Sequence, residues 1–476
     1  MTRTRKDIEA GDRTSLRAQV RAITLATAAI SSSAAALTAC GDDPFPATPI
    51  GPTDAGADVR EASLPPVDDG GGAPGEPDAD AGRPTYDASD EPVLCATTPC
   101  VTQVAAGERH FCALINDGTV RCWGTDTRGS LGRELDGAAP GTDPQPVAGL
   151  TNAKQISAGA LGKTTCAVVD DGHVWCWGDN SGAQLGLAPS PPETYVRDNQ
   201  PHPIPTQVAL VDQIVRVDVG QENACALRAD GKVYCWGGND SYELARPGTS
   251  GFYQPVGLAE LGDHPIARLV LTQNSSFAIT KTGQLLGWGR PSGRQTSLPS
   301  TEGSPFPVLL PSLDDVTRAA TSGASGSNEH QCAIASGSVY CWGTNVRGEL
   351  GTGVPDKEQI PACAGIVTDA GVFPQGLALG PHRSCVRMTN GTVQCCGDDR
   401  LGQLGRGGDA GTFANVFGPA VAVTGHVVQV ASSANATCAL LQGGKVVCWG
   451  GNANGELGQG TTDTDPHPTP VEVVFP

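Results

Sequence analysis

The sequence predicts an all-β fold in which one unit of paired strands is repeated seven times after a disordered N-terminal tether. Three observations lead to this prediction. The 476-residue chain has 63 glycines and 37 prolines but only 17% charged residues, which suits short strands and tight turns better than long helices. A cysteine-containing segment recurs at nearly constant spacing after residue 100. The residues before 95 lack this pattern and are rich in Ala, Pro, Gly and Asp.

Residues 1–39 have the pattern of a lipoprotein signal peptide. Six Lys or Arg residues lie between Arg3 and Arg21, and small, mildly apolar residues follow. Leu37-Thr38-Ala39 stands directly before Cys40, as in the bacterial lipobox, where the cysteine is acylated and becomes the mature N-terminus. We expect Cys40 to be lipidated and the protein to be anchored in the cell envelope, facing the periplasm or the exterior. An ordinary secretory peptide that happens to contain a cysteine is the alternative.

Residues 40–94 are predicted to be a disordered, acidic, Pro/Gly-rich linker. Between residues 41 and 94 there are 13 Asp or Glu residues against Arg60 and Arg83 alone. Such a segment cannot bury enough apolar surface to offset the entropy lost on ordering. As a flexible coil it would span roughly 40 Å, so we interpret it as a tether between the membrane and the folded body.

The remaining residues, 95–476, hold the repeats. The typical copy contains a first cysteine, a second cysteine followed by Trp-Gly, and then Leu-Gly; the first copy has Cys112, Cys122-Trp123-Gly124 and Leu131-Gly132. The fourth copy is degenerate, and the sixth has Cys396 in place of the tryptophan. The first positions of the seven copies are 112, 166, 225, 277, 332, 385 and 438, with spacings of 54, 59, 52, 55, 53 and 53. A period this regular indicates one structural unit per copy.

The two cysteines of a copy are predicted to face each other across a β-hairpin. In the first copy, β-prone runs flank Asn116-Asp117-Gly118, a hairpin turn signal. Pairing Ile115 with Thr119 places Cys112 opposite Cys122. In the fifth copy the cysteines are nine residues apart instead of ten, but the turn shortens to two residues and the register is kept.

The fourth copy supports disulfide bonds between these pairs, because it lacks both cysteines together and has Phe277 and Gly287 instead. Zinc sites are the alternative, but the CxxC knuckles and Cys/His clusters they require do not occur in the sequence. The pairs expected to be bridged are Cys112–Cys122, Cys166–Cys176, Cys225–Cys235, Cys332–Cys341, Cys385–Cys395 and Cys438–Cys448. The leftover cysteines suggest two further pairs, Cys95–Cys100 and Cys363–Cys396. So many cysteines point to an oxidising compartment.

The repeat resembles that of the regulator of chromosome condensation family. The resemblance covers about residues 101–476 and rests on the cysteine hairpin, Trp-Gly, the Gly-x-Leu-Gly ending and the asparagines Asn180, Asn239, Asn345 and Asn452. It implies a seven-bladed β-propeller. Radial closure also suits repeated four-stranded sheets, because it hides their edges; a linear solenoid is the alternative.

The two ends of the repeat region suggest how the ring closes. Val101–Gly107 is expected to be the second half of a strand pair, and Pro470–Phe475 the first half of another. We therefore predict that the two segments meet in one blade.

The sequence offers few candidates for chemistry. The serine-hydrolase, zinc-protease, P-loop and dinucleotide motifs are absent, so we expect no enzyme activity and no cofactor. His110 and His330 stand at the same position of their copies, which favours a structural hydrogen-bonding role. The candidate binding loop is the irregular stretch with Tyr195, Arg197 and His202, in the longest spacing between copies.

We therefore interpret the protein as a non-enzymatic, extracytoplasmic lipoprotein, a monomer, whose propeller binds an unidentified protein or glycan. Its contact with the membrane would be through the lipid alone. The formal net charge of −19 disfavours nucleic acid, which needs a basic surface. The alternative, implied by the founding family member, is guanine-nucleotide exchange on a nuclear GTPase together with chromatin binding.

Overall fold

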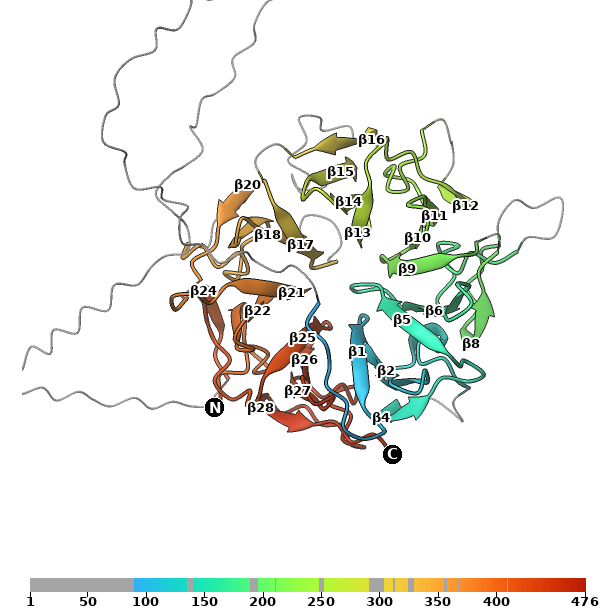
Figure 1. The fold of residues 1–476 in the computed structure, drawn as a ribbon. Coiled ribbons are helices and arrows are strands. Elements are labelled where there is room, and N and C mark those ends of the chain that lie inside the picture. The colour runs from blue at the N-terminus through green and yellow to red at the C-terminus, as the bar shows by residue number, and fades with distance from the viewer. Residues whose placement is uncertain are drawn as a thin grey trace, which may run out of the picture. The chain divides into compact units, whose positions relative to one another are not determined.

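The computed structural model describes residues 90–134, 141–188, 196–209, 211–247, 252–290, 304–310, 313–323, 329–354, 358–366, 368–408 and 410–476. These residues form seven antiparallel sheets of four strands each, arranged as the blades of a propeller (Figure 1). The predicted all-β, seven-bladed fold is therefore confirmed. Cys40 and the rest of the segment before Asp90 lie outside the described residues.

Each blade consists of four strands that are consecutive in the chain. Blades 1 to 3 contain β1 (Val101–Ala106), β2 (His110–Ile115), β3 (Val120–Gly124) and β4 (Gly141–Pro146); β5 (Ala153–Ala158), β6 (Thr164–Val169), β7 (Val174–Gly178) and β8 (His202–Gln207); and β9 (Ile214–Val219), β10 (Asn223–Arg228), β11 (Val233–Gly238) and β12 (Tyr253–Leu258). Blades 4 and 5 contain β13 (Ile266–Leu271), β14 (Ser275–Thr280), β15 (Leu285–Gly289) and β16 (Ser304–Leu309), then β17 (Val316–Thr321), β18 (His330–Ala335), β19 (Ser338–Gly343) and β20 (Glu358–Cys363). Blades 6 and 7 contain β21 (Pro374–Gly380), β22 (Arg383–Met388), β23 (Val393–Asp398) and β24 (Phe413–Pro419), then β25 (Val427–Ser432), β26 (Ala436–Leu441), β27 (Val446–Gly450) and β28 (His467–Glu472). A short 3-10 helix, Thr127–Gly129, follows β3.

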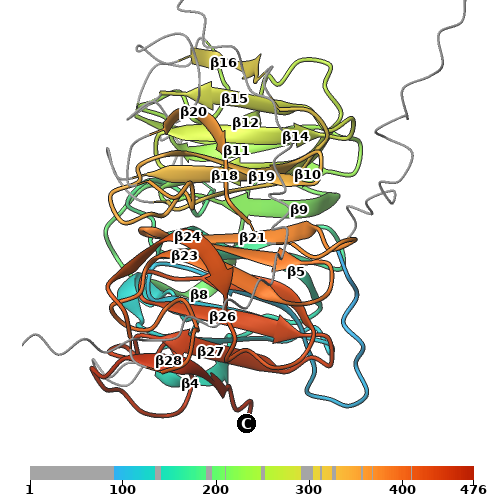
Figure 2. The ribbon, with the colours of Figure 1, turned by 90° about the vertical axis from the view of Figure 1, so that its left-hand side faces the viewer.

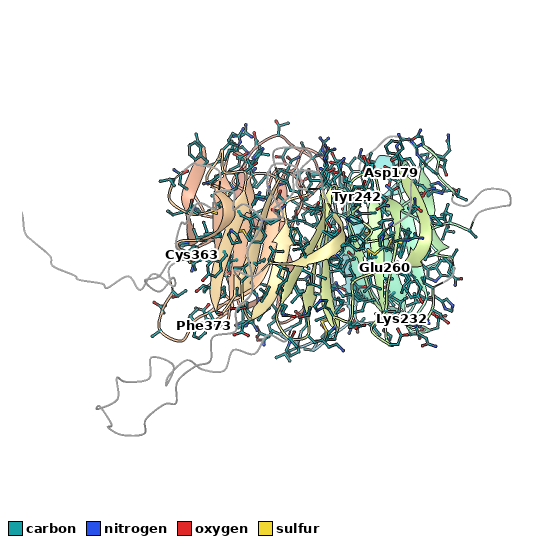
Figure 3. All side chains as sticks on the ribbon, turned by 90° about the horizontal axis from the view of Figure 1, so that it is seen from above. Asp179, Lys232, Tyr242, Glu260, Cys363 and Phe373 are labelled. Atoms are coloured by element: carbon teal, nitrogen blue, oxygen red, sulfur yellow. A yellow bond between two sulfur atoms is a disulfide. The ribbon has the colours of Figure 1, made fainter. Side chains whose placement is uncertain are left out.

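The first strand of each blade lies at the centre of the ring and the fourth at its periphery (Figure 1). The ring has two faces. The hairpin turns between second and third strands lie on one, here called the hairpin face, where Figure 3 labels Lys232 and Phe373. The Gly-x-Leu-Gly loops lie on the other, the loop face, where Figure 3 labels Asp179 and Tyr242. No helix among the described residues is long and apolar enough to cross a membrane.

The hairpin register places the cysteines opposite each other. Cys112 pairs with Cys122 across β2 and β3, and Cys332 pairs with Cys341 in spite of the shorter turn. The structure contains disulfides at all six predicted hairpins, with Cα–Cα distances of 4.1–4.2 Å. In blade 4 the equivalent pair is Phe277 opposite Gly287. A seventh disulfide joins Cys95 to Cys100, directly before β1.

Neighbouring blades are held together by buried apolar clusters, one at each of the seven interfaces. The repeat tryptophans are almost fully buried in these interfaces. In five blades the indole N–H donates a hydrogen bond to the backbone carbonyl just before the repeat leucine of the preceding blade. The structure describes this bond, at 2.8–3.0 Å, for Trp123 to Glu456, Trp177 to Ser130, Trp236 to Gln184, Trp288 to Glu243 and Trp449 to Gln403.

The backbone conformation after each tryptophan explains why a glycine follows it. Gly124 has φ of 106°, a region that residues with a Cβ rarely adopt. A Cβ at this position would lie 2.4 Å from the carbonyl oxygen of Arg109. In the Trp-Gly dipeptide, the tryptophan therefore supplies a hydrogen-bond donor to the blade interface, and the glycine allows a backbone bend that a residue with a Cβ could not adopt.

The predicted mode of ring closure is wrong. β1 pairs with β2 and β28 pairs with β27, so no blade contains strands from both ends of the chain. The ring closes because blade 7 packs side by side against blade 1. Val473 and Phe475, just after β28, join the cluster that contains Val101 and Trp123. The two terminal segments are each complete within their own repeat, which leaves no half-blade to be filled.

The suggested Cys363–Cys396 disulfide is also not formed. Cys396 is a free and fully buried thiol. It occupies the tryptophan position of blade 6, and its Sγ lies 3.4 Å from the backbone carbonyl of Glu349, the carbonyl that an indole N–H would otherwise reach. Cys363 lies on the outermost strand of blade 5, β20, so the two side chains belong to different layers of the ring.

Candidate functional site

The central channel is lined by the first strand of each blade, and one position on these strands is polar in six of the seven blades. It lies opposite the residue two places after the first cysteine position, next to a β-bulge. From blade 1 to blade 7 its occupants are Gln103, Gln155, Arg216, Arg268, Arg318, Gly376 and Gln429.

The glutamines at this position link blades through their amide groups. Gln103 donates to the carbonyl of Ile156 and accepts from its N–H, both at 2.9 Å. Gln155 makes the same two bonds to Val217, at 2.9 Å each. Gln429 makes them to Val104, at 2.8 and 3.0 Å, and so bridges the two ends of the ring. The glutamine is therefore a structural connector wherever it occurs.

Arginine replaces the glutamine in three consecutive blades, at Arg216, Arg268 and Arg318. Arg387 of β22, whose Cα partner is Gly376, adds a fourth guanidinium in blade 6. These four residues, here called the arginine cluster, line a hollow of about 230 Å³ at the hairpin-face end of the channel. The side chains of Arg318 and Arg387 are only 12% and 3% exposed.

The segment that precedes β1 runs across this end of the channel. In Figure 1 it begins near the inner ends of β21 and β25 and runs outward, and Figure 2 shows it from the side, along one face of the ring. Asp90 accepts hydrogen bonds from Arg268 and Arg318 at 2.9 and 2.8 Å. Glu91 accepts one from Arg387 at 2.7 Å and lies 2.7 Å from Nε2 of His426. We call residues 90–95 the docked segment.

Charge decides the protonation of the two carboxyl groups in the docked segment. Burial raises the pKa of Asp90, but the guanidinium groups of Arg268 and Arg318 outweigh it and hold that pKa below its usual value. Burial likewise raises the pKa of Glu91, and His426 and Arg387 together lower it below its usual value. Both carboxylates are therefore ionised at neutral pH.

The loop-face end of the channel holds a second and larger hollow, of about 510 Å³. Charged side chains of both signs line it, with Lys163 3.7 Å from Glu108 and Arg128 3.9 Å from Asp179. Burial, and the carboxylates of Asp240 and Asp179, raise the pKa of Glu222 in its wall. We call it the loop-face hollow.

The predicted binding loop lies beside the loop-face hollow. Tyr195 falls outside the described residues. Arg197 donates from Nε to the carbonyl of Ser181 at 2.5 Å, and its guanidinium lies 4.3 Å from the ring centre of Tyr253. Asn199 lines the hollow, and its carbonyl accepts a hydrogen bond from Arg128. The loop is therefore fixed to the rim of the hollow by Arg197 and Asn199.

His202, the third predicted loop residue, has a different role. Its Nε2 lies 2.9 Å from Asp198, which also accepts a hydrogen bond from Asn180. Blade 7 repeats this arrangement, with His467 2.7 Å from Asp463 and Asn452 bonded to the same carboxylate. An arrangement found in two blades indicates a structural role for His202.

The two repeat histidines also connect blades. Nε2 of His110 lies 3.0 Å from Oγ1 of Thr165 in blade 2, and Nε2 of His330 lies 2.9 Å from Oγ of Ser384 in blade 6. Burial lowers the pKa of each imidazole to about 4. Both rings are therefore neutral, and both lie in blade interfaces, as their repetition predicts.

Buried carboxyl groups at the loop face accept hydrogen bonds from the backbone of their own loops. Burial raises the pKa of Glu243 to about 8. Oε2 of Glu243 accepts a hydrogen bond from the N–H of Ser241 at 2.7 Å, and Glu349 and Glu456 accept equivalent bonds in their own copies. Within the described part of the chain, no group of three His, Cys, Asp or Glu side chains is placed to hold a metal ion.

Comparisons with known proteins agree with the repeat. Models of the regulator of chromosome condensation repeat match residues 101–130, 153–184, 214–243 and 427–456, and a second model of this repeat matches 171–227. The ultraviolet-B receptor UVR8 of Arabidopsis thaliana is 27% identical over 326 residues, which cover 67% of this chain and 70% of the receptor. The human E3 ubiquitin-protein ligase HERC2 is 25% identical over 74% of this chain, but the match spans only 7% of the ligase.

The similarity extends to solved structures. The crystal structure of Prp20p from Saccharomyces cerevisiae superimposes with a TM-score of 0.64 at 19% identity, over 76% of this chain and 87% of that one. This likeness concerns the fold. The chain therefore contains regulator of chromosome condensation repeats, matched in blades 1, 2, 3 and 7, and it folds as a seven-bladed β-propeller.

Proposed function

We propose that the protein is an exported lipoprotein whose propeller serves as a non-enzymatic binding module for a protein or a glycan. The observation that carries this proposal is the contrast between frame and loops. Six of the seven blades have their central hairpin cross-linked, whereas irregular loops surround the loop-face hollow. A fixed frame that presents variable loops is suited to recognition.

Export is supported by the cysteines. The seven disulfides that the structure describes are typical of an oxidising compartment, and so many are rare in the cytosol. The lipid anchor is proposed from Leu37-Thr38-Ala39-Cys40 alone. Cys40→Ala should move the protein from the membrane fraction to the soluble fraction of the envelope. A wild-type protein that is already soluble, or a mature chain that does not begin at Cys40, would contradict the anchor.

A non-enzymatic role is supported by what the unusual titratable groups contact. His110, His330 and Glu243 all have strongly shifted pKa values, which is a common property of catalytic residues. Each of these side chains makes a hydrogen bond that stabilises a loop or a blade interface. Their shifted pKa values are therefore explained by structural burial.

The second candidate function is nucleotide exchange or chromatin binding. It is favoured by the likeness to Prp20p, which was studied for its binding to Gsp1p and histones. Against it, residues 101–476 have 23 basic and 34 acidic residues, so the propeller has little basic surface for nucleic acid. DNA affinity that falls steeply with added salt would favour this second function.

The experiment for the binding module is affinity capture from cell-envelope extracts with the mature chain as bait. The test variants are Arg197→Ala and Lys163→Ala, at the rim and in the wall of the loop-face hollow. The matched control is Lys232→Ala, on the hairpin face. The proposal predicts a specific partner whose recovery falls at least tenfold with the test variants and is unchanged with the control, at equal melting temperatures. Partners recovered equally by all four proteins would contradict it.

A further inference from the structure

We propose that the arginine cluster is a second binding site, specific for two adjacent carboxylates of an extended acidic peptide, and that the chain's own Asp90-Glu91 is its resident competitor. The site lies on the hairpin face, at the opposite end of the channel from the loop-face hollow, and does not depend on the function proposed above.

The arginine cluster interrupts the pattern of glutamines that connect neighbouring blades. Gln103, Gln155 and Gln429 each make two hydrogen bonds to the next blade. Arg216, Arg268 and Arg318 stand at the same register in blades 3 to 5. The sequence thus places positive charge in three neighbouring blades at positions where glutamine would have connected them.

The hollow at the arginine cluster is lined by positively charged side chains. Arg216, Arg268, Arg318 and Arg387 all line it. Asp218 pairs with Arg216, with contacts of 2.6 and 2.8 Å. Four guanidinium groups thus converge on a narrow hollow, and Asp218 is the carboxylate paired with Arg216. Repulsion between the guanidinium groups favours an anionic occupant, and such groups match carboxylate geometry well.

A peptide of this chain already occupies the site, with the side chain of Asp90 exposed and that of Glu91 largely buried. Asp90 reaches two arginines and Glu91 reaches a third, so neighbouring carboxylates in an extended chain fit the spacing of the cluster. The Asp90 side chain remains 72% exposed, and Leu94 is 60% exposed. The backbone N–H of Leu94 adds one bond of 2.7 Å to the carbonyl of Gln442.

The Cys95–Cys100 disulfide explains why the resident segment holds the site. The bridge fixes the chain five residues after Asp90. A tether this short gives the segment an effective concentration on the order of millimolar at the arginine cluster. A partner's acidic peptide must displace it, so the wild-type site responds only to a tighter or more abundant ligand.

The test uses the full mature chain and a fluorescent peptide with the sequence of Asp90–Leu94, followed by fluorescence anisotropy. One protein carries Asp90→Asn and Glu91→Gln, which neutralise the resident competitor. It should bind the peptide at least tenfold more tightly than the wild type. A control peptide with Asn and Gln in place of the two acidic residues should not bind.

Arg268→Gln and Arg318→Gln, added to the neutralised protein, should each weaken peptide binding at least tenfold. Glutamine is the natural residue at this register in three other blades, so these variants should fold, and unchanged melting temperatures check that they do. Lys232→Gln, on the same face, is the matched control and should bind as before.

Two results would overturn the proposal. One is that the neutralised protein binds the acidic peptide no better than the wild type. The other is that inorganic phosphate at equal concentration displaces the peptide as well as unlabelled acidic peptide does, which would make the cluster a general anion site.

Discussion

The indole Nε1 of Trp123 donates a hydrogen bond of 2.9 Å to the backbone carbonyl of Glu456, which lies 333 residues later in the chain. This bond joins blade 1 to blade 7 and repeats the bond that links blades within the ring. The seam between the chain ends is therefore built like the other interfaces, with Gln429 bonded to Val104 and an apolar cluster beneath.

Trp123→Phe should destabilise the propeller by about 1–3 kcal/mol, because the buried carbonyl of Glu456 loses its donor. Trp236→Phe is the matched variant, since it removes the equivalent bond to Gln184 within the ring. Chemical denaturation measures both. Equal losses would fit a seam that resembles the other interfaces, and an unchanged free energy of unfolding for Trp123→Phe would contradict the role given to this bond.

Deleting residues 473–476 should lower the free energy of unfolding by about 2–4 kcal/mol, because Val473 and Phe475 leave the cluster at the seam. All 28 strands remain in the deleted protein, so it should stay folded at low temperature. Thermal melting compares it with the full chain. An identical melting curve would show that these residues do not contribute to closure.

Replacing both Cys225 and Cys235 by alanine should cost about 2–3 kcal/mol, since the bridge closes a short loop in the unfolded chain. Replacing buried Cys396 alone removes no bridge, and it serves as the comparison. Urea unfolding without reductant gives the difference. If the double variant is as stable as the wild type, the hairpin bridges do not hold the frame.

The free energy of unfolding should fall as the pH is lowered from about 6.5 to about 4. Burial lowers the pKa of His110 and His330 to about 4 in the folded protein, so over this range the unfolded chain binds protons that the folded one does not. Each histidine contributes up to about 3 kcal/mol to this loss.

His110→Asn tests this pH dependence, because Asn223 is the natural residue at the same position in blade 3. The variant should lose the share of the pH slope that belongs to His110. A slope of the free energy of unfolding with pH that His110→Asn leaves intact would contradict the assignment.

Much of the fold could be predicted because each repeat carries its own register. The spacing of Cys112 and Cys122 around a turn signal defines the hairpin, and the shorter turn before Cys341 preserves it. Closure could not be predicted in the same way. The sequences of β1 and β28 are each suited to the edge of a sheet. They do not indicate whether each strand completes its own blade or whether the two strands share one blade.

The candidate sites were less accessible from the sequence. Arg216, Arg268 and Arg318 stand where other copies have a glutamine, and the sequence alone contains this substitution. The β-bulge in each first strand determines that the position faces the channel, and the sequence does not predict that bulge. Asp90 contacts Arg268 and Arg318, which lie 178 and 228 positions later in the chain, and no local sequence pattern predicts these contacts. The predicted Cys363–Cys396 pair is wrong because the Cys396 thiol takes the place of an indole at a blade interface.

The redox state of the hairpin cysteines is the most direct test of the proposal that this propeller is an exported, cross-linked scaffold. Protein taken from growing cells should be alkylated without reductant, digested and mapped by mass spectrometry. Bridges are expected at all six hairpins and at Cys95–Cys100, with Cys396 labelled only after unfolding. Alkylated cysteines at the hairpins of the native protein would instead indicate a reducing compartment and would contradict the proposed export.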